Sequence, residues 1–420
     1  MLRFLRRHRT ALTLTGAVLG AGLGLIVNAL AGPPAWSIEY VAQPIGDVFL
    51  RLLFMLVIPL LFSALVLGVC ELELKNLGRM GLRMLGYTVV VSAVAVAIGI
   101  VSINTFRPGD GLQSVRQASA GAEAPPTPDV SPIELLVNMV PDNPVKAAAT
   151  GDMLAVIFFA LVFGIALMLT ETEGTRALKG TIQGLYDVSM RMIDGVLLLM
   201  PLGVAALLYS MTARLGFGVL VQLAGFVGVV MFGLLLHMIV VYSLSVRFFG
   251  GMSPLRFFSE AKDAMITAFT TSSSSATLPT ALRVAEQNLK LPREVSRFVL
   301  TAGSAMNQNG TALFEGVTVL FLAQVYGVEL GLTEQLTVVA ICILGGIGTA
   351  GVPACSIPLI ALILEMYNIP REGLGLILGI DRLLDMSRTT LNVTGDLAAA
   401  VYVARATKPE ELGREAPPPA

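Results

Sequence analysis

The chain has 420 residues, of which 55% are hydrophobic and only 14% are charged, and its formal net charge is −1. Soluble domains carry roughly a quarter charged residues, so this composition excludes an ordinary soluble domain and indicates a membrane protein with several spans. The near-neutral charge gives no basic surface for nucleic acid, and two histidines with three scattered cysteines argue against a metal centre.

The chain begins with "MLRFLRRHRT", which holds four arginines, and an apolar run from Ala11 to Ala31 follows. This run is long enough to span a bilayer and further apolar segments come after it, so we predict a retained first transmembrane helix. A cleavable secretory signal is the alternative, because the run ends near "ALAG", which resembles a cleavage site. The arginines predict that residues 1–10 form a cytoplasmic basic segment.

Five more apolar segments complete six predicted transmembrane helices within residues 11–250, at about 44–70, 84–105, 153–170, 192–211 and 217–246. Lysines and arginines follow the second, fourth and sixth spans, and the positive-inside rule places those connections in the cytoplasm. By the same rule residues 106–133, rich in proline, alanine and glycine, form a flexible external loop. Residues 406–420 are predicted to be a cytoplasmic tail.

Two later apolar segments are interrupted by small and polar residues, at Thr270 to Pro279, "TTSSSSATLP", and at Gly345 to Pro358, "GGIGTAGVPACSIP". Non-helical backbone at membrane depth must be buried in protein or line a wet cavity, because lipid offers it no hydrogen-bond partner. The apolar arms beside each interruption are too short for two full spans. We therefore predict two re-entrant hairpins, a pattern that points to a transporter's binding site.

The final helix carries the segment "DRLLDMSRTTLNVTGD". Its polar residues fall within an arc of roughly 80° and a length of about 22 Å, and they are Asp381, Asp385, Arg388, Asn392 and Asp396. A charge near the bilayer centre costs roughly 2.5–3.5 kcal/mol, whereas an i,i+3 ion pair returns only a few tenths. We predict that this face lines a substrate and ion path; internal salt bridges are the alternative.

A second polar cluster, "GSAMNQNGTALFE" from Gly303 to Glu315, interrupts an apolar helix that runs from about Val295 to Gln324. Gly310 and the amides beside it predict a local unwinding that frees backbone carbonyls. Carbonyl and amide oxygens suit sodium, and Asp396 would add a negative charge. An ordinary helix interface joined by amides is the alternative.

Glu315 lies between "TALF" and "GVTVLFLAQ", in surroundings that disfavour a charged carboxylate. Such a group suits the uptake and release of a proton during transport, and a structural hydrogen bond to a neighbouring helix is the alternative. No histidine or lysine lies near the serine run in sequence to activate a nucleophile, so we expect a protein that is not an enzyme. Serines and helix N-termini at a hairpin tip suit a carboxylate instead.

The segments "MLVIPLLFSALVLG", "NGTAL", "GTAGVP" and "LDMSRTTLNVTGD", with the serine-rich hairpin, resemble the dicarboxylate/amino acid:cation symporters, which include glutamate and aspartate transporters. The resemblance covers nearly the whole chain. It implies an all-α integral membrane protein of eight transmembrane helices and two re-entrant helical hairpins. It also implies a homotrimer, a fixed scaffold and an elevator-type transport domain whose core, residues 251–405, comprises hairpin 1, helix 7, hairpin 2 and helix 8.

The resemblance further assigns a binding site residue by residue. Arg388 would bind the side-chain carboxylate of an acidic amino acid, a role that suits a guanidinium fork, with Asp381 supporting it. Asp385 would bind the substrate's ammonium group. The remaining substrate residues would be Ser272, Ser273, Ser274, Thr311, Val352, Thr389 and Asn392. One sodium ion would be held by Asp396 with carbonyls of Gly303, Asn307 and Asn392, and another by Ala305 with backbone from Gly346 to Thr349.

The sequence departs from the family pattern at the ion sites. The usual "NMDGT" reads "NQNGT", so Gln308 and Asn309 replace a methionine and an aspartate. The matching third-span positions, Thr88, Val91 and Ser92, lack one hydroxyl. Because an amide contributes only a dipole to a cation, we predict that a third sodium site is weak or absent.

Two further positions bear on coupling and substrate. Glu315 falls where the glutamate transporters carry a proton-accepting glutamate, which makes proton coupling an expectation. Many relatives place an additional arginine at the position of Ser272 or Met386, and neither is arginine here. Arg382 is a candidate substitute.

The leading prediction is secondary active uptake of glutamate or aspartate across the inner (plasma) membrane, driven by protons, sodium or both, without an organic cofactor. Both termini would be cytoplasmic, and no nucleic acid is expected as a partner. A C4-dicarboxylate carrier would not need Asp385, and a small neutral amino-acid carrier would not need Arg388. An anion channel is a more remote alternative, because the polar residues are concentrated in one part of the chain rather than along several helices.

Overall fold

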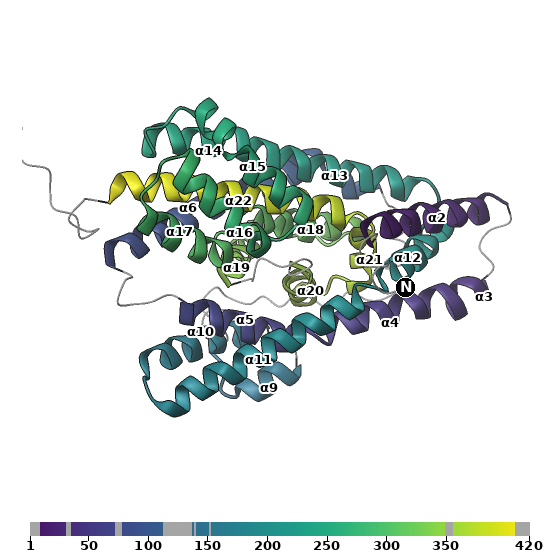
Figure 1. The fold of residues 1–420 in the computed structure, drawn as a ribbon. Helices are drawn as coiled ribbons and strands as arrows, with labels where there is room; N and C mark the ends of the chain where they lie inside the picture. The colour runs from purple at the N-terminus through teal and green to yellow at the C-terminus, as the bar shows by residue number, and fades with distance from the viewer. Residues whose placement is uncertain are drawn as a thin grey trace, which may run out of the picture.

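The computed structural model describes residues 9–30, 35–71, 78–111, 137, 140–150, 153–348 and 356–407. Every regular element within these ranges is a helix, in agreement with the predicted all-α class (Figure 1). Most of the predicted basic segment 1–10, external loop 106–133 and tail 406–420 lies outside the described residues.

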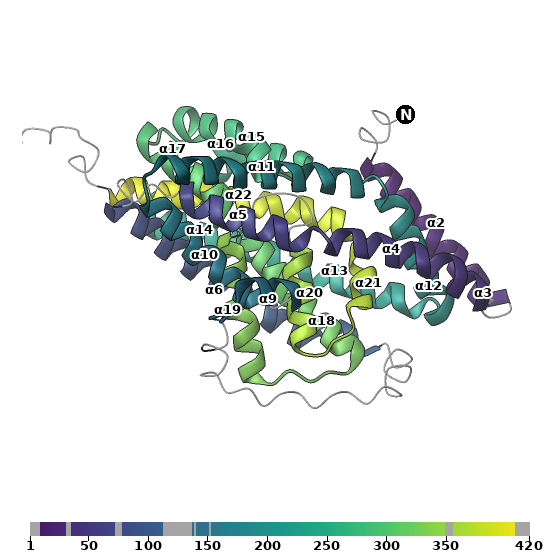
Figure 2. The same ribbon diagram turned by 90° about the horizontal axis from the view of Figure 1, so that it is seen from below.

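A first group of helices comes from residues 9–71 and 144–215. Its members are α2 (Arg9–Leu30), α3 (Ala35–Ser37), η1 (Ile38–Ala42), α4 (Gln43–Phe54), α5 (Val57–Glu71), α9 (Pro144–Thr150), α10 (Met153–Leu169), α11 (Glu173–Val196) and α12 (Met200–Leu215). α2 packs along α12, and α5 packs against α10 and α11. Figure 2 shows α5 and α11 running alongside each other.

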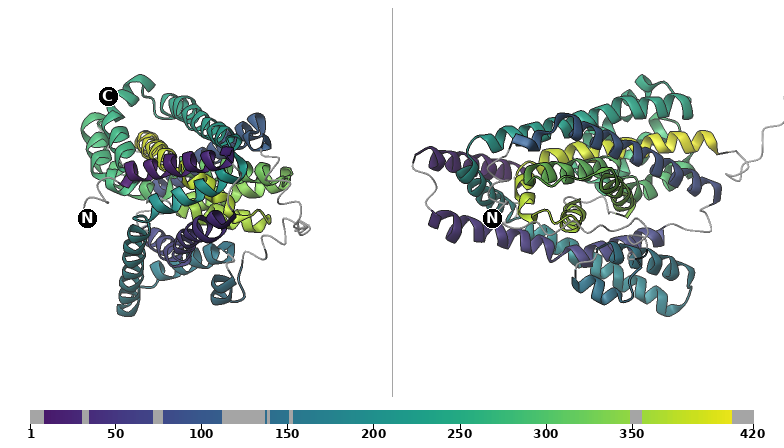
Figure 3. Two further views of the ribbon diagram at one scale, coloured as in Figure 1. Left: turned by 90° about the vertical axis from the view of Figure 1, so that its right-hand side faces the viewer. Right: turned by 180° about the vertical axis from the view of Figure 1, so that it is seen from behind.

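The second group, from residues 78–111 and 218–407, holds the polar segments. It comprises α6 (Gly78–Phe106), η2 (Pro108–Gly111), α13 (Gly218–Leu236), η3 (His237–Val241), α14 (Tyr242–Leu244), η4 (Ser245–Phe249), α15 (Pro254–Thr271), α16 (Ser274–Arg283), η5 (Val284–Asn288), α17 (Arg293–Met306), α18 (Asn309–Tyr326), α19 (Leu332–Gly348), α20 (Ser356–Met366), η6 (Arg371–Gly373), α21 (Leu374–Leu378) and α22 (Asp381–Ala406). α18 and α22 pack against each other, with α6, α13, α15 and α17 around them. Figures 1 and 3 show α22 in this group, on the opposite side of the molecule from α10 and α11.

Four helical segments in the described part of the chain are long and apolar enough to cross a membrane: Ala11–Leu30, Ile38–Leu67, Arg79–Gly111 and Gly218–Phe249. A fifth candidate joins α11 to α12 but bends by 56°. The apolar segment predicted at about 192–211 therefore contains a helix break, between Val196 and Met200. Pro201 favours a break here, since proline has no backbone N–H, its ring would clash with the Leu197 carbonyl in a continuous helix, and it is well tolerated in the first turn of α12.

Both predicted interruptions coincide with helix ends. α15 ends at Thr271 and is followed by its C-cap Ser272, whose φ of 51° is left-handed, and α16 then packs back against α15. α19 ends at Gly348 and α20 begins at Ser356, and the rest of the predicted interruption, residues 349–355, lies outside the described residues. α19 and α20 also pack against each other.

Three glycines spaced four residues apart allow α2 to approach α12 closely. A Cβ atom on Gly16 or Gly20 would overlap the backbone carbonyl of Pro201 or Ala205, respectively. Small residues at this spacing let two helix backbones pack directly, which favours helix association in a membrane, where lipid provides no hydrophobic driving force. Gly24 continues the same stripe toward the end of α2.

We predict that Gly20→Leu weakens the packing of α2 on α12, at a cost of about 1–3 kcal/mol, because the new side chain must displace backbone. Gly22→Leu is the matched control, since a Cβ at Gly22 meets nothing within 4 Å. The measurement is thermal unfolding of the detergent-solubilised protein. Equal unfolding temperatures for the two variants would contradict the close packing of these helices.

Candidate functional site

The polar face of α22 points into the protein. Exposed fractions are 3% for Asp381, 7% for Asp385, 2% for Arg388, 2% for Asn392 and 3% for Asp396. The helix begins with Asp381 in its first turn and has Arg405 in its last, an arrangement that favours the helix dipole. The charged stripe is therefore enclosed by neighbouring helices rather than by lipid.

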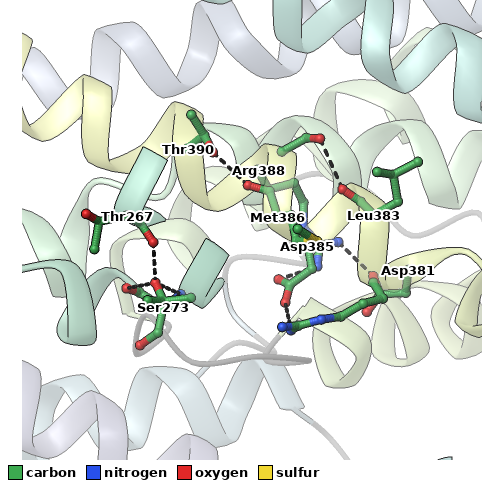
Figure 4. Close-up of polar contacts among 11 residues, drawn as sticks. Thr267, Ser273, Asp381, Leu383, Asp385, Met386, Arg388 and Thr390 are labelled. Carbon is green, nitrogen blue, oxygen red and sulfur yellow. Dashed lines mark hydrogen bonds and ion pairs between the residues drawn. The ribbon is translucent and has the colours of Figure 1, made fainter. Parts of the chain in front are cut away.

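Arg388 lies near the carboxylates of Asp381 and Asp385 (Figure 4), and it also contacts an aromatic ring. Its Nη1 lies 3.1 Å from Asp381 Oδ1, and its Nη2 donates to Asp385 Oδ1 at 2.9 Å. The guanidinium carbon lies 3.9 Å from the centroid of the Phe314 ring, which α18 supplies. Two opposite charges and a cation–π contact offset the desolvation of this buried cation.

The unwinding predicted within "NQNGT" is present, at Asn307 and Gln308. α17 ends at Met306 and α18 begins at Asn309, which leaves these two residues with non-helical backbone angles. Gly310 lies inside α18, where a Cβ would come within 2.9 Å of the Arg388 carbonyl oxygen. The glycine therefore permits close contact with α22, and its N–H donates to Asn392 Oδ1 at 2.7 Å.

The side chain of Gln308 connects the helix break to α22. Its Oε1 accepts a hydrogen bond from Asn392 Nδ2 at 2.5 Å, and its Nε2 donates to the Ser304 carbonyl at 3.0 Å. Asn392 Nδ2 also donates to Thr311 Oγ1 at 3.1 Å. Thr311 and Asn392, two of the predicted substrate residues, are thus brought together by the residue that departs from the family pattern.

An oxygen-rich site forms where α17 meets the end of the polar stripe. Asn307 Nδ2 donates to Asp396 Oδ1 at 3.0 Å, and a Cβ on Gly303 would lie 2.7 Å from the same oxygen. Asn307 Oδ1 is buried and has no hydrogen-bond partner among the described residues. A carboxylate beside an unpartnered amide oxygen has the chemistry of a cation site.

The other predicted sodium ligands are only partly described. Gly346, near the end of α19, approaches the break, since a Cβ there would lie 3.5 Å from the Gln308 carbonyl oxygen. Ala305 lies in the last turn of α17. Thr349 and Val352 fall outside the described residues.

Asn309 is enclosed by a neutral hydrogen-bond network that includes a residue not singled out from the sequence. Ser92 Oγ donates to Asn309 Oδ1 at 2.6 Å, and Asn309 Nδ2 donates to the Tyr242 hydroxyl at 3.0 Å. Tyr242 in turn donates to the Leu391 carbonyl at 3.1 Å. The only sequence signal for Tyr242 was a hydroxyl in an otherwise apolar run. Asn309 joins α18 to α6 and α14, as the helix-interface alternative expects.

Glu315 is fully buried on α18, and neither carboxylate oxygen has a hydrogen-bond partner among the described residues. It lies close enough to Arg388 and to the Cys342 thiol of α19 for electrostatic interaction. The alternative of a hydrogen bond to a neighbouring helix is thus not seen in the described part of the chain. Glu315 sits where α18 meets α19.

The serines of the first interruption lie at the junction of α15 and α16, both of which pack against α22. Ser272 is 1% exposed, and its hydroxyl has no partner among the described residues. Ser273 caps α16 by accepting from the Ala276 N–H at 3.2 Å, and Ser274 begins that helix. Thr389, predicted for the same pocket, is buried on α22.

The sequence model of the sodium:dicarboxylate symporter family matches residues 10–406. The chain belongs to this family. The proton/sodium-glutamate symport protein of Geobacillus stearothermophilus is 32% identical over 394 residues, covering 92% of each chain. The proton/glutamate-aspartate symporter of Escherichia coli (strain K12) is 31% identical over 396 residues, covering 92% of this chain and 90% of the relative. Neutral amino acid transporter A of Bos taurus is 31% identical over 441 residues, covering 94% and 82%.

These comparisons confirm the family resemblance that the sequence motifs indicated, and they make the protein a symporter rather than an enzyme. Its membrane character agrees with the apolar helices described above. The relatives differ in the amino acids that their names state, so the residues of this symporter's own site carry the substrate argument.

We predict that Tyr242→Phe destabilises the symporter by about 1–3 kcal/mol, because the buried Asn309 amide and Leu391 carbonyl lose a hydrogen-bond partner. Tyr209→Phe is the control, since that hydroxyl is only partly buried and pairs with Ser37 in the first group. Unfolding temperatures in detergent give the comparison. If Tyr242→Phe unfolds no earlier than Tyr209→Phe, the network does not stabilise α18 in the way described.

Proposed function

We propose that the symporter takes up acidic amino acids, glutamate or aspartate, together with protons, sodium ions or both. The observation that carries this proposal is the buried pair of Arg388 and Asp385, 2.9 Å apart on one face of α22. A cation and an anion this close match the side-chain carboxylate and the ammonium of one small substrate. The names of the bacterial relatives, which state glutamate or aspartate transport, support the same substrate class.

The substrate exchanges for the internal ion pair. Its side-chain carboxylate binds the fork of Arg388, which Asp381 continues to hold from the other side, and its ammonium binds Asp385. Thr311, Thr389 and Asn392 complete the pocket. The serines at 272–274 and the backbone near Val352 close it from the two hairpin tips.

Cation binding follows the oxygen atoms around the helix break. Asp396, the Asn307 amide oxygen, Asn392 and the Gly303 carbonyl bind one sodium ion, and Ala305 with the end of α19 from Gly346 to Thr349 binds another. A third site is weak or absent, because Asn309 is neutral and its oxygen already accepts from Ser92. Glu315 carries a proton, since a buried carboxyl without a partner is most stable when protonated.

The chain forms eight transmembrane helices and two re-entrant hairpins. The second group of helices, with residues 251–405 as its core, is the elevator-type transport domain that moves against the first group as scaffold. Three copies form the homotrimer in the inner (plasma) membrane, with both termini in the cytoplasm. The division of contacts into two groups and the paired helix interruptions support this arrangement.

The alternative functions, two other carriers and a channel, leave part of the site unexplained. A C4-dicarboxylate carrier has no use for Asp385 as an ammonium ligand, and a neutral amino-acid carrier has no use for Arg388. An anion channel requires polar residues along a continuous pore, whereas here they gather around α22 and the break before α18. Uptake of labelled glutamate, aspartate and succinate into proteoliposomes, with sodium and pH gradients imposed separately, distinguishes these functions. Saturable, gradient-driven uptake of an acidic amino acid is expected, and flux that neither saturates nor follows a gradient would contradict the proposal.

In that assay Arg388→Ala should reduce uptake of acidic amino acids by about a hundredfold or more, because the substrate carboxylate loses its buried charge partner, at a cost of about 2–5 kcal/mol in binding free energy. Arg388→Lys keeps the charge without the bidentate fork and should also transport poorly while retaining the fold. Arg283→Ala, which removes a half-exposed arginine paired with Asp263, is the control. Undiminished glutamate uptake by Arg388→Ala would refute the assigned role.

Glu315→Gln should remove the component of uptake that an imposed pH gradient drives, because glutamine fills the same space but cannot exchange a proton. The sodium-driven component should remain. Glu329→Gln, at the exposed end beyond α18, is the matched control and should retain the response to pH. A proton-driven component that survives in Glu315→Gln would exclude this residue as the proton carrier.

A further inference from the structure

Asp385 is contacted by a second arginine, Arg382, which lies three residues earlier on α22. Arg382 Nη1 is 3.6 Å from Asp385 Oδ2, and the exposed fractions of the two side chains are 14% and 10%. Arg388 Nη2 occupies the other oxygen, Oδ1, at 2.9 Å. Each oxygen of this carboxylate therefore faces a different guanidinium.

The two contacts differ in strength. A separation of 2.9 Å is a direct charge-assisted hydrogen bond, whereas 3.6 Å is beyond hydrogen-bond distance and leaves mainly the charge interaction. A substrate ammonium that binds Asp385 can thus replace Arg382 at Oδ2 more readily than it replaces Arg388 at Oδ1. Arg382 is also the more exposed of the two arginines, so it can withdraw toward water.

The charges of this cluster sum to zero, because Asp381 and Asp385 are balanced by Arg382 and Arg388. With Arg382 removed, the one basic partner left to Asp385 among the described residues is Arg388, which Asp381 shares, and the cluster has a net negative charge. An amino acid compensates that charge with its own ammonium. A diacid of the same length without an ammonium cannot compensate it and would place an additional anion beside Asp385.

We propose that Arg382 determines how strictly the site requires an ammonium group on its substrate, by neutralising Asp385 whenever the substrate supplies none. This inference rests on the proposed uptake of acidic amino acids. Arg382 acts through Asp385, so it is a positioning residue for the ammonium site. An i,i+3 pair that only stabilised the helix would leave substrate preference unchanged.

The test uses competition in proteoliposomes. Uptake of labelled glutamate is inhibited with unlabelled glutamate or with glutarate, its analogue without the amino group, and the ratio of the two inhibition constants is compared among variants. Arg382→Gln should raise the inhibition constant of glutarate, divided by that of glutamate, by about tenfold or more, which is the size expected for one charge pair shielded from water. Arg382→Lys should return the ratio toward that of the unmodified protein. Arg405→Ala, an exposed arginine about six turns further along α22, should leave it unchanged.

The outcomes separate this inference from the proposed function. If the unmodified protein transports glutamate but Arg382→Gln keeps the same glutarate-to-glutamate ratio, the role of Arg382 is overturned and the proposed function stands. If the unmodified protein neither transports nor binds glutamate, the proposed function fails and the inference fails with it. If Arg382→Gln unfolds in detergent, Arg382→Ala and Arg382→Lys are compared instead. The inhibition constant of glutarate divided by that of glutamate is expected to rise in Arg382→Ala but not in Arg382→Lys. Equal ratios in these two variants would overturn the inference.

Discussion

The ion pairs of Arg388 with Asp381 and Asp385 constrain how much of the second helix group packs, because this buried charge must be enclosed. A guanidinium removed from water loses several kcal/mol of hydration, and only well-placed opposite charges and hydrogen bonds return that free energy. α22 therefore has to lie at the centre of its group, with α18 supplying Phe314 on one side and the α15–α16 pair packing on another. Other helices, such as α6 and α13, belong to the segments that are long and apolar enough to cross a membrane.

The break between α17 and α18 is the second constraint, and it depends on the first. Non-helical backbone at this depth needs protein partners, and α22 supplies them through Asn392, which accepts from the Gly310 N–H and donates to Gln308. Two glycines allow the approach: Gly310 on α18 leaves room for the α22 backbone, and Gly395 on α22 leaves room for the Tyr242 hydroxyl. The proposed substrate residues Thr311 and Asn392 are thus joined by hydrogen bonds to the helix break that precedes α18.

The sequence predicted those features of the site that follow from the free-energy cost of burying charge. The spacing of the polar residues on α22 identified one face, and the insertion cost of those charges required that face to be enclosed. The sequence placed the helix break within "NQNGT" but not at Asn307 and Gln308 in particular, because Gly310 signals flexibility in the sequence, whereas in the fold it provides space for the Arg388 backbone. The hydrogen bond between Tyr242 and Asn309 and the contact between Arg382 and Asp385 also could not be predicted. They depend on side-chain rotamers and on packing between segments that are distant in the sequence.

The bend at Leu197–Leu199 could not be predicted either, because it also depends on packing between helices. Hydropathy averages across residues 192–211 and cannot resolve a break that Pro201 and the packing of α12 on α2 impose. The departure at Asn309 was visible in the sequence, but its consequence depends on Ser92 and Tyr242 occupying the amide on both sides. The sequence therefore showed that a carboxylate expected at a cation site is an amide here. The contacts between helices show that this amide instead joins a hydrogen-bond network.

The most direct measurement is an experimental structure of the protein in lipid with glutamate bound. The side-chain carboxylate of glutamate is predicted to lie within about 3 Å of the Arg388 guanidinium, with its ammonium at Asp385, inside the second helix group. Glutamate bound away from α22, with Arg388 still paired to both Asp381 and Asp385, would contradict the central claim that this buried charged face is the substrate site.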